Sequence, residues 1–257
     1  MNTLTSKDGV TIAYEKTGSG PAVIVISGAF CDHHHGTGLA EHLADRFTVY
    51  TYDRRGRGQS SDSPDTGLAP AEHEIDDLDA LIAEAGGSAM AFTHSSGAHV
   101  ALKALGRGSA ITRLVMYDPP LNAGHQGRTE PPELKQRLEE MLAGGRRGEA
   151  VETFQREWIG LPAEVVEQVR HAPFRAGLEA IAGSLPYEVA IVGTHTDLSA
   201  VHVPALVLLG GDNAPVLHEA ARVVVDGVAG ARLQVLEGQN HDLVPEAAGP
   251  AVAAFLG

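Results

Sequence analysis

A serine lies at the junction between a buried apolar segment and a helix-forming segment. Residues 89–94 read Ala-Met-Ala-Phe-Thr-His, Ser95 and Ser96 follow, and a helical pattern begins at Gly97. A sharp strand-to-helix turn would hold Ser95 in a strained conformation, expose its Oγ above a sheet and place the N–H of Ser96 at a helix N-terminus. These features suit a nucleophile beside a site for negative charge. Taken alone, Ser95 fits the N-cap of an ordinary helix equally well.

Apolar segments of strand length recur along the chain and alternate with helical patterns. Several are apolar at every position, which indicates strands buried on both faces. The predicted strands are residues 22–27, 47–52, 89–93, 111–117, 205–209 and 232–236, and the predicted helices are residues 38–44, 70–85, 97–105, 215–228 and 243–256. Repeated strand and helix predict a mostly parallel α/β sheet covered on both faces. Residues 3–5 and 10–17 predict an antiparallel hairpin at one edge.

The alternation stops between residues 119 and 203, where charged helical stretches with proline and glycine replace the buried strands. We therefore expect a core of residues 1–118 and 204–257, with a helical cap inserted at 119–203. The predicted cap helices are residues 132–142, 149–158, 162–171 and 174–184. Most large apolar residues of the cap should fill its interior, and a minority should line a substrate pocket. Candidates for the face that meets the core are Phe154, Trp158, Ile159, Phe174, Leu178, Ile181 and Tyr187.

Four segments together resemble the α/β-hydrolase fold family in order and spacing. Residues 93–97 are similar to its G-x-S-x-G turn, with Thr93 in place of the first glycine. Residues 27–29, Ser-Gly-Ala, stand where the family has His-Gly after a strand, and residues 53–60 match its D-x-R-G-x-G-x-S turn. His241 follows the last predicted strand, where the family carries its histidine. The resemblance covers nearly the whole chain and implies an eight-stranded, mostly parallel sheet with helices on both faces.

The resemblance also implies a Ser-His-Asp triad and an oxyanion hole. Ser95 would be the nucleophile and His241 its general base. The backbone N–H groups of Ala29 and Ser96 would bind the oxyanion, a role that does not depend on their side chains. Such a site needs neither a metal nor a cofactor.

The position of the acid is open. At the family's usual place, after a late strand, the chain has Asn213, with Asp212 one residue earlier. A second place known in the family follows the strand after the nucleophile helix, and there this chain has Asp118. We favour Asp118, with Asp212 as the alternative and a site without an acid as the third option. Either carboxylate would hydrogen-bond His241 and stabilise the imidazolium that forms when Ser95 attacks.

Two further polar clusters receive no catalytic assignment. We interpret residues 53–60 as a structural turn with a local network of aspartate and arginine, and no G-x-G-x-x-G is present to bind phosphate. Residues 31–35 read Cys-Asp-His-His-His. Consecutive residues cannot all face one ion and no second ligand set is evident, so we predict no metal site and place them at the pocket mouth. His94 and His99 are also given no catalytic role.

Composition excludes several classes of protein. The chain has 257 residues, one cysteine and a formal net charge of −14 at pH 7. Nucleic acids and anionic membranes both require a cationic surface, so we expect neither as a partner. No apolar run approaches the roughly 18 residues that a membrane span needs, and the first residues show no targeting pattern. We expect a cytoplasmic monomer or homodimer that acts on a small molecule.

The expected activity is hydrolysis of an ester, thioester or lactone through an acyl-enzyme. Epoxide hydrolases and haloalkane dehalogenases of this fold use a carboxylate nucleophile, so Ser95 argues against both. One alternative is a cofactor-free cyclase, isomerase or lyase that uses the pocket for acid-base chemistry, which the departures at Ser27 and Asn213 motivate. The other is a non-catalytic small-molecule receptor on the same fold.

Overall fold

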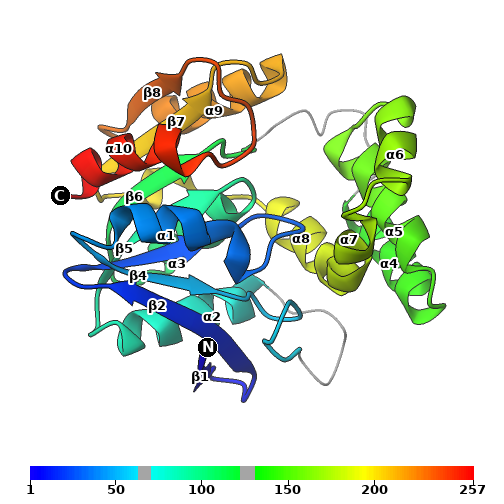
Figure 1. The fold of residues 1–257 in the computed structure, drawn as a ribbon, viewed down its shortest axis with the longest axis horizontal. Helices are drawn as coiled ribbons and strands as arrows, with labels where there is room; N and C mark the ends of the chain where they lie inside the picture. The colour runs from blue at the N-terminus through cyan, green and yellow to red at the C-terminus, as the bar shows by residue number, and fades with distance from the viewer. Residues whose placement is uncertain (63–70, 122–130) are drawn as a thin grey trace.

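One central sheet of eight strands organises the computed structural model, which describes residues 1–62, 71–121 and 131–257 (Figure 1). The strands are β1 (Asn2–Thr5), β2 (Thr11–Gly18), β3 (Ala22–Ile26), β4 (Thr48–Tyr52), β5 (Ala89–His94), β6 (Ile111–Tyr117), β7 (Ala205–Gly210) and β8 (Arg232–Leu236). Their order across the sheet is β1-β2-β4-β3-β5-β6-β7-β8. The β1–β2 and β2–β4 pairs are antiparallel and the others are parallel. The predicted eight-stranded, mostly parallel sheet and its edge hairpin are confirmed.

Burial of the strands follows their apolar pattern. Strands β4, β5 and β7 are buried at every position, whereas β1 and β8 lie at the two edges and are largely exposed. Helices α1 (Thr37–Leu43) and α10 (Pro245–Leu256) cover one face of the sheet. Helices α2 (Ala71–Glu84), α3 (Gly97–Arg107) and α9 (Pro215–Gly227) cover the other. Each face therefore has its own apolar cluster, as expected for a sheet between two helical layers.

The predicted core helices are all present, with ends that differ from the prediction by at most two residues. Residue 70, where the predicted second helix starts, lies outside the described residues. Within the described ranges, no helix combines the length and the apolar composition that crossing a membrane requires.

The residues between β6 and β7 form a separate helical group (Figure 1). It comprises α4 (Pro131–Ala143), α5 (Arg147–Thr153), a π-helical turn (Phe154–Ile159), α6 (Ala163–Arg170), α7 (Arg175–Ile181) and α8 (Leu185–Val192). Helices α4 to α7 stand clear of the sheet, and α8 lies between them and the core. Helix α8 packs on α4 of this helical insertion and on α2 and α3 of the core. Residues 122–130 of the insertion lie outside the described residues.

Helix α8 is absent from the sequence prediction, although it joins the insertion to the core. Its sequence, Leu-Pro-Tyr-Glu-Val-Ala-Ile-Val, is apolar around most of its circumference and has Pro186 in its first turn. An amphipathic stripe marks a helix that is covered on one side only. Because α8 is covered by core and insertion together, no such stripe is present.

The apolar interior of the insertion lies around Phe154 and Trp158, both buried as expected. The core contributes Phe30 to this cluster, and its ring meets that of Phe154 edge to face at a centroid distance of 5.4 Å. The expectation is wrong for Ile159 and Phe174, which are 43% and 58% exposed. Helical spacing alone does not distinguish the outer from the inner side of such short helices.

Gly97, the first residue of α3, generates a stability prediction. A Cβ at this position would clash with the carbonyl oxygen of Ile26 at the end of β3. We expect Gly97→Ala to lower the free energy of unfolding by about 1–3 kcal/mol, the usual cost of forcing extra volume into a packed site. Urea denaturation followed by circular dichroism measures this change. In Gly177→Ala, within α7, nothing lies within 4 Å of the new methyl. That control should be neutral or stabilise by up to about 1 kcal/mol. An equal loss of unfolding free energy in both variants would contradict the close approach of α3 to the end of β3.

Candidate active site

Three strained residues mark the carboxyl ends of three adjacent strands. Phe30 follows β3, Ser95 follows β5 and Asp118 follows β6. They are the non-glycine residues with positive φ in the described ranges, at 60°, 53° and 49°. Such backbone conformations are costly for L-residues and persist only where the surroundings impose them. The chain crosses over β3 on its way from β4 to β5, and α/β sheets form their binding crevice at such a switch point.

His241 bridges Ser95 and Asp118. Its Nε2 lies 3.0 Å from Ser95 Oγ and its Nδ1 lies 3.1 Å from Asp118 Oδ2. Asp118 is fully buried, Ser95 is half-buried, and the His241 side chain is 42% exposed. In this arrangement Nε2 of the imidazole can accept the proton of the Ser95 hydroxyl. The buried carboxylate of Asp118 accepts a hydrogen bond from Nδ1 and so fixes the tautomer of the ring.

The carboxylate of Asp118 is held by two donors besides His241. Gly210 N–H donates to Oδ1 at 3.0 Å, and Asn213 Nδ2 donates to Oδ2 at 2.8 Å. Asn213, which stands where the family usually has its acid, therefore orients the carboxylate of Asp118, which follows a different strand. Asp212 is exposed, and among the described residues no hydrogen bond joins its carboxylate to His241. The structure thus brings Asp118, and not Asp212, to the histidine.

The loop that carries His241 is fastened by two residues to which the sequence analysis gives no role. His94 Nε2 donates to the carbonyl oxygen of His241 at 2.9 Å, and the Tyr117 hydroxyl donates to that of Asn240 at 2.8 Å. Burial, with His241 and His35 nearby, lowers the pKa of His94 well below its usual value, so the ring is neutral. The sequence analysis could not find these contacts because 147 residues separate His94 from His241.

The predicted oxyanion residues lie in the two segments that border Ser95. A Cβ built on Gly28 would lie 2.7 Å from Ser95 Cβ, so only glycine lets the loop after β3 approach the nucleophile this closely. Ser96 directly precedes helix α3. Neither the Ala29 nor the Ser96 N–H donates a hydrogen bond to another described residue. Both amides therefore keep an unused donor within the described residues.

Two fully buried arginines support the loop after β3. Arg54 donates to the carbonyl oxygen of Ser27 at 3.1 Å. Arg57 donates to those of Gly28 at 2.6 Å and Cys31 at 3.2 Å. The polar network predicted for the 53–60 turn is present, but it is not local, because its arginines fix the backbone that carries Ala29.

Glu188 of α8 is the buried counterion of both arginines. It contacts Arg57 and lies 2.7 Å from Arg54, whose other side is paired with Glu74 of α2. Burial by itself would raise the pKa of Glu188, but the two guanidiniums outweigh it and lower the pKa to about 2. The carboxylate is therefore charged at neutral pH and ties the insertion to the core.

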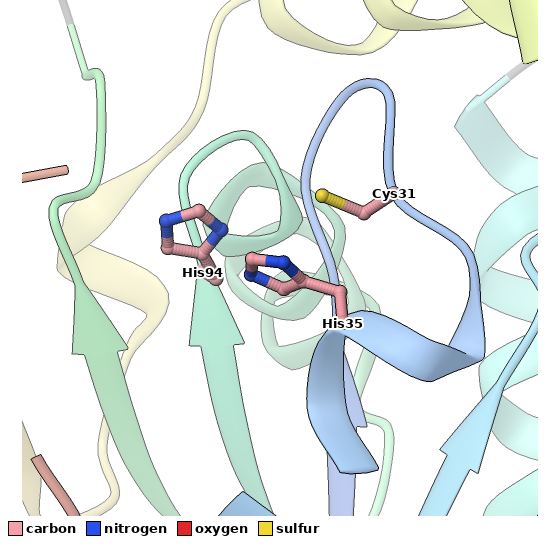
Figure 2. A group of neighbouring side chains, drawn as sticks. All are labelled: Cys31, His35 and His94. Atoms are coloured by element: carbon pink, nitrogen blue, oxygen red, sulfur yellow. The ribbon is translucent and has the colours of Figure 1, made fainter. Parts of the chain in front are cut away.

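The residues of the Cys-His run separate into two groups. His33 Nδ1 is bound to Asp53 Oδ1 at 2.8 Å, and the exposed His34 contacts Asp32. Cys31 and His35 instead face His94 at the end of β5 (Figure 2). Burial raises the pKa of the Cys31 thiol to about 11, so the thiol is protonated at neutral pH.

Comparisons with known proteins agree with this fold. Residues 23–255 match the model of the alpha/beta hydrolase family. The crystal structure of an alpha/beta hydrolase from Sphaerobacter thermophilus is similar over 100% of both chains, with 41% sequence identity and a TM-score of 0.91. N-formylmaleamate deformylase from Pseudomonas putida is 29% identical over 198 residues, which are 76% of this chain and 72% of that protein. An enol-lactonase from Burkholderia xenovorans, at 19% identity over 99% of both chains and a TM-score of 0.75, shares the fold.

Glu188 generates a second stability prediction. Glu188→Gln leaves two buried guanidiniums short of one negative charge, so we expect the free energy of unfolding to fall by roughly 3 kcal/mol or more. Glu149→Gln is the matched control, because Glu149 forms an exposed pair with Arg146 at 3.0 Å and such pairs contribute less than about 1 kcal/mol. Urea unfolding of both variants measures the difference. A similar loss of unfolding free energy in both variants would show that the buried pairs of Glu188 stabilise the fold no more than an exposed pair does.

The same carboxylate predicts how stability depends on pH. Its pKa is about 2 in the folded protein against an ordinary value of 4.5, so its stabilisation is complete above pH 4.5 and is lost as the pH falls toward about 2. The wild type should therefore lose stability more steeply than Glu188→Gln in this range. Unfolding midpoints measured at several pH values test this expectation, which parallel curves would contradict.

Proposed function

This chain belongs to the alpha/beta hydrolase family, and from that premise we propose that it is a serine hydrolase of small-molecule esters, thioesters or lactones. The observation that carries the proposal is the bridge that His241 makes between Ser95 and Asp118. The similarity to a deformylase and an enol-lactonase supports a hydrolytic reaction at a carbonyl carbon. N-formyl amides therefore belong in the test panel beside esters and lactones.

In the proposed first step, Ser95 Oγ attacks the substrate carbonyl carbon while His241 Nε2 takes the serine proton. The imidazolium that forms is stabilised by Asp118. Because Gly210 and Asn213 already hold this carboxylate in place, little reorganisation accompanies the charge change.

The negative charge on the carbonyl oxygen would be bound by the N–H groups of Ala29 and Ser96. Loss of one such donor costs roughly 10²–10³ in kcat in enzymes of this type. His241 then gives its proton to the leaving group, and the acyl group stays on Ser95. Water, deprotonated by His241, attacks the acyl-enzyme and restores the serine.

We further propose that the helical insertion acts as the cap of this site. Ala29 and Phe30 of the core pack against its apolar cluster, so the segment that binds the oxyanion also contacts the insertion. The edge-to-face contact of Phe30 with Phe154 supplies an apolar wall on that side. Apolar walls beside a few fixed donors are typical of sites for small molecules.

The test is a comparison of three variants with wild type on p-nitrophenyl esters of short to medium acyl chains. Ser95→Ala should abolish the pre-steady-state burst and turnover. Asp118→Asn should lower kcat by roughly 10⁴, the loss measured when a triad aspartate is neutralised. Asp212→Asn is the matched control and should keep a rate close to that of wild type, because its carboxylate does not reach the histidine. An equal loss in both aspartate variants would contradict the assignment of the acid.

Labelling separates hydrolysis from the alternative functions. A fluorophosphonate should add once to wild type and not to folded Ser95→Ala, as read by intact mass. If wild type remains unlabelled and inactive on esters, lactones and N-formyl amides, the proposal fails and cofactor-free acid-base chemistry is favoured. If a ligand binds equally to wild type and Ser95→Ala without turnover, the receptor alternative is favoured.

A further inference from the structure

The sulfur of Cys31 and the imidazoles of His35 and His94 lie close together next to the loop after β3. Cys31 comes from this loop, His35 comes from the 3-10 helical turn that follows it (His33–Gly36), and His94 comes from the end of β5 (Figure 2). One donor atom of each lies within 4.8 Å of the other two. Cysteine sulfur with histidine nitrogen is a donor set that zinc prefers, and three protein ligands leave the fourth tetrahedral position for water.

His94 is prepared to act as a ligand. Its Nε2 donates to the carbonyl oxygen of His241, which fixes the proton on that nitrogen and leaves a lone pair on Nδ1. Nδ1 is buried and has no hydrogen-bond partner among the described residues, and the side chain is only 5% exposed. An unsatisfied buried acceptor is costly. A second ring nitrogen bound to a backbone carbonyl is also the usual support of a metal-binding histidine.

His35 adds a second buried nitrogen. Its Nε2 has no hydrogen-bond partner within the described ranges. The His35 and His94 rings are stacked, with their centroids 4.6 Å apart and their planes at 30°, so a small rotation of the rings must accompany binding of one ion by both. The neighbouring group of Asp32, His33 and His34 lacks these features, because His33 is bound to Asp53 and His34 is exposed.

We propose that Cys31, His35 and His94 bind one Zn²⁺ ion and that this ion inhibits hydrolysis. Binding forms one bond to sulfur and two to nitrogen, and the Cys31 thiol proton is released to solvent. Tetrahedral zinc places such donors about 3.3–3.6 Å apart, so donors that now lie within 4.8 Å of one another must close by up to about 1.5 Å.

This closure would disturb both sides of the proposed active site. His94 precedes Ser95 and holds the loop of His241. Cys31 lies two residues after Ala29, and its Sγ–H donates to the Ala29 carbonyl oxygen at 3.3 Å, a bond that is lost with the thiol proton. A misplacement of about 1 Å can lower a catalytic rate roughly 10²-fold. Zinc binding and efficient hydrolysis are therefore opposed.

The zinc site is tested by absorption spectroscopy on protein without a histidine tag. Titration of Co²⁺ into wild type should produce a sulfur-to-cobalt charge-transfer band in the near ultraviolet that saturates at one ion per chain. Zn²⁺ should displace the cobalt and remove the band. Cys31→Ser should lack the band, and His35→Ala should bind more than about 100-fold more weakly, since even outer-shell partners contribute about 10- to 100-fold.

His34→Ala is the matched control, because it removes an exposed histidine from the same loop. It should bind Co²⁺ like wild type, and circular dichroism should show that all three variants are folded. Absence of the charge-transfer band in wild type, or equal weakening by His34→Ala and His35→Ala, would overturn the site.

The inhibitory effect rests on the proposed hydrolase function and is measured separately. Zn²⁺ should lower wild-type hydrolysis more than about tenfold, EDTA should restore it, and Cys31→Ser should keep its own metal-free rate. Zinc that binds without slowing hydrolysis would overturn inhibition. The cobalt spectrum needs no activity, so failure of the hydrolase proposal and failure of the zinc site are distinguishable.

Discussion

Burial of Arg54 and Arg57 is the constraint on which the arrangement of the active site depends. A guanidinium removed from water needs a counterion and a partner for each N–H group. Glu188 and Glu74 supply the negative charge, and the carbonyl oxygens of Ser27 and Gly28 after β3 accept further hydrogen bonds from the two guanidiniums. The loop that carries Ala29 is thus held by the need to satisfy buried charge. The same need fixes α8 against the core, because moving its glutamate away would leave Arg57 without its acidic partner and Arg54 with Glu74 alone.

Backbone strain is concentrated at the same edge of the sheet as this loop. Phe30, Ser95 and Asp118 have positive φ at the ends of three adjacent strands. Each has close neighbours from other segments: Phe30 packs on the insertion, Gly28 closely approaches Ser95, and Asp118 accepts hydrogen bonds from Gly210 and Asn213. A strained backbone holds the side chains of Ser95 and Asp118 in one orientation, so in the proposed reaction little conformational freedom is left to be lost when a substrate binds.

The sequence was sufficient for the sheet and for the serine turn, because continuous apolar strands and small residues at a crossing are local patterns. It was insufficient wherever a partner lies far along the chain. Asp118 and Asp212 remained alternatives in the sequence, because the contacts of Asp118 with Asn213 and His241 join residues 95 and 123 positions apart. Nothing in the sequence indicated that His94 lies near Cys31. The two are close because β3 pairs with β5, and the order of strands in the sheet is not a local pattern. Helix α8 was missed because contact on all sides removed the polarity pattern that reveals helices.

The helices of the insertion differ in what they contact, and this difference bears on how the substrate preference of the protein could change in evolution. Glu188 and Tyr187 of α8 contact the 53–62 segment of the core, whereas α4, α5 and the π-helical turn pack with the other side of α8 around the apolar interior of the insertion. Mutations in those outer helices can reshape the wall next to Phe30 while the charge pairs of α8 stay intact. Selection for new substrates can therefore change the outer helices of the insertion while the proposed catalytic residues of the core stay the same.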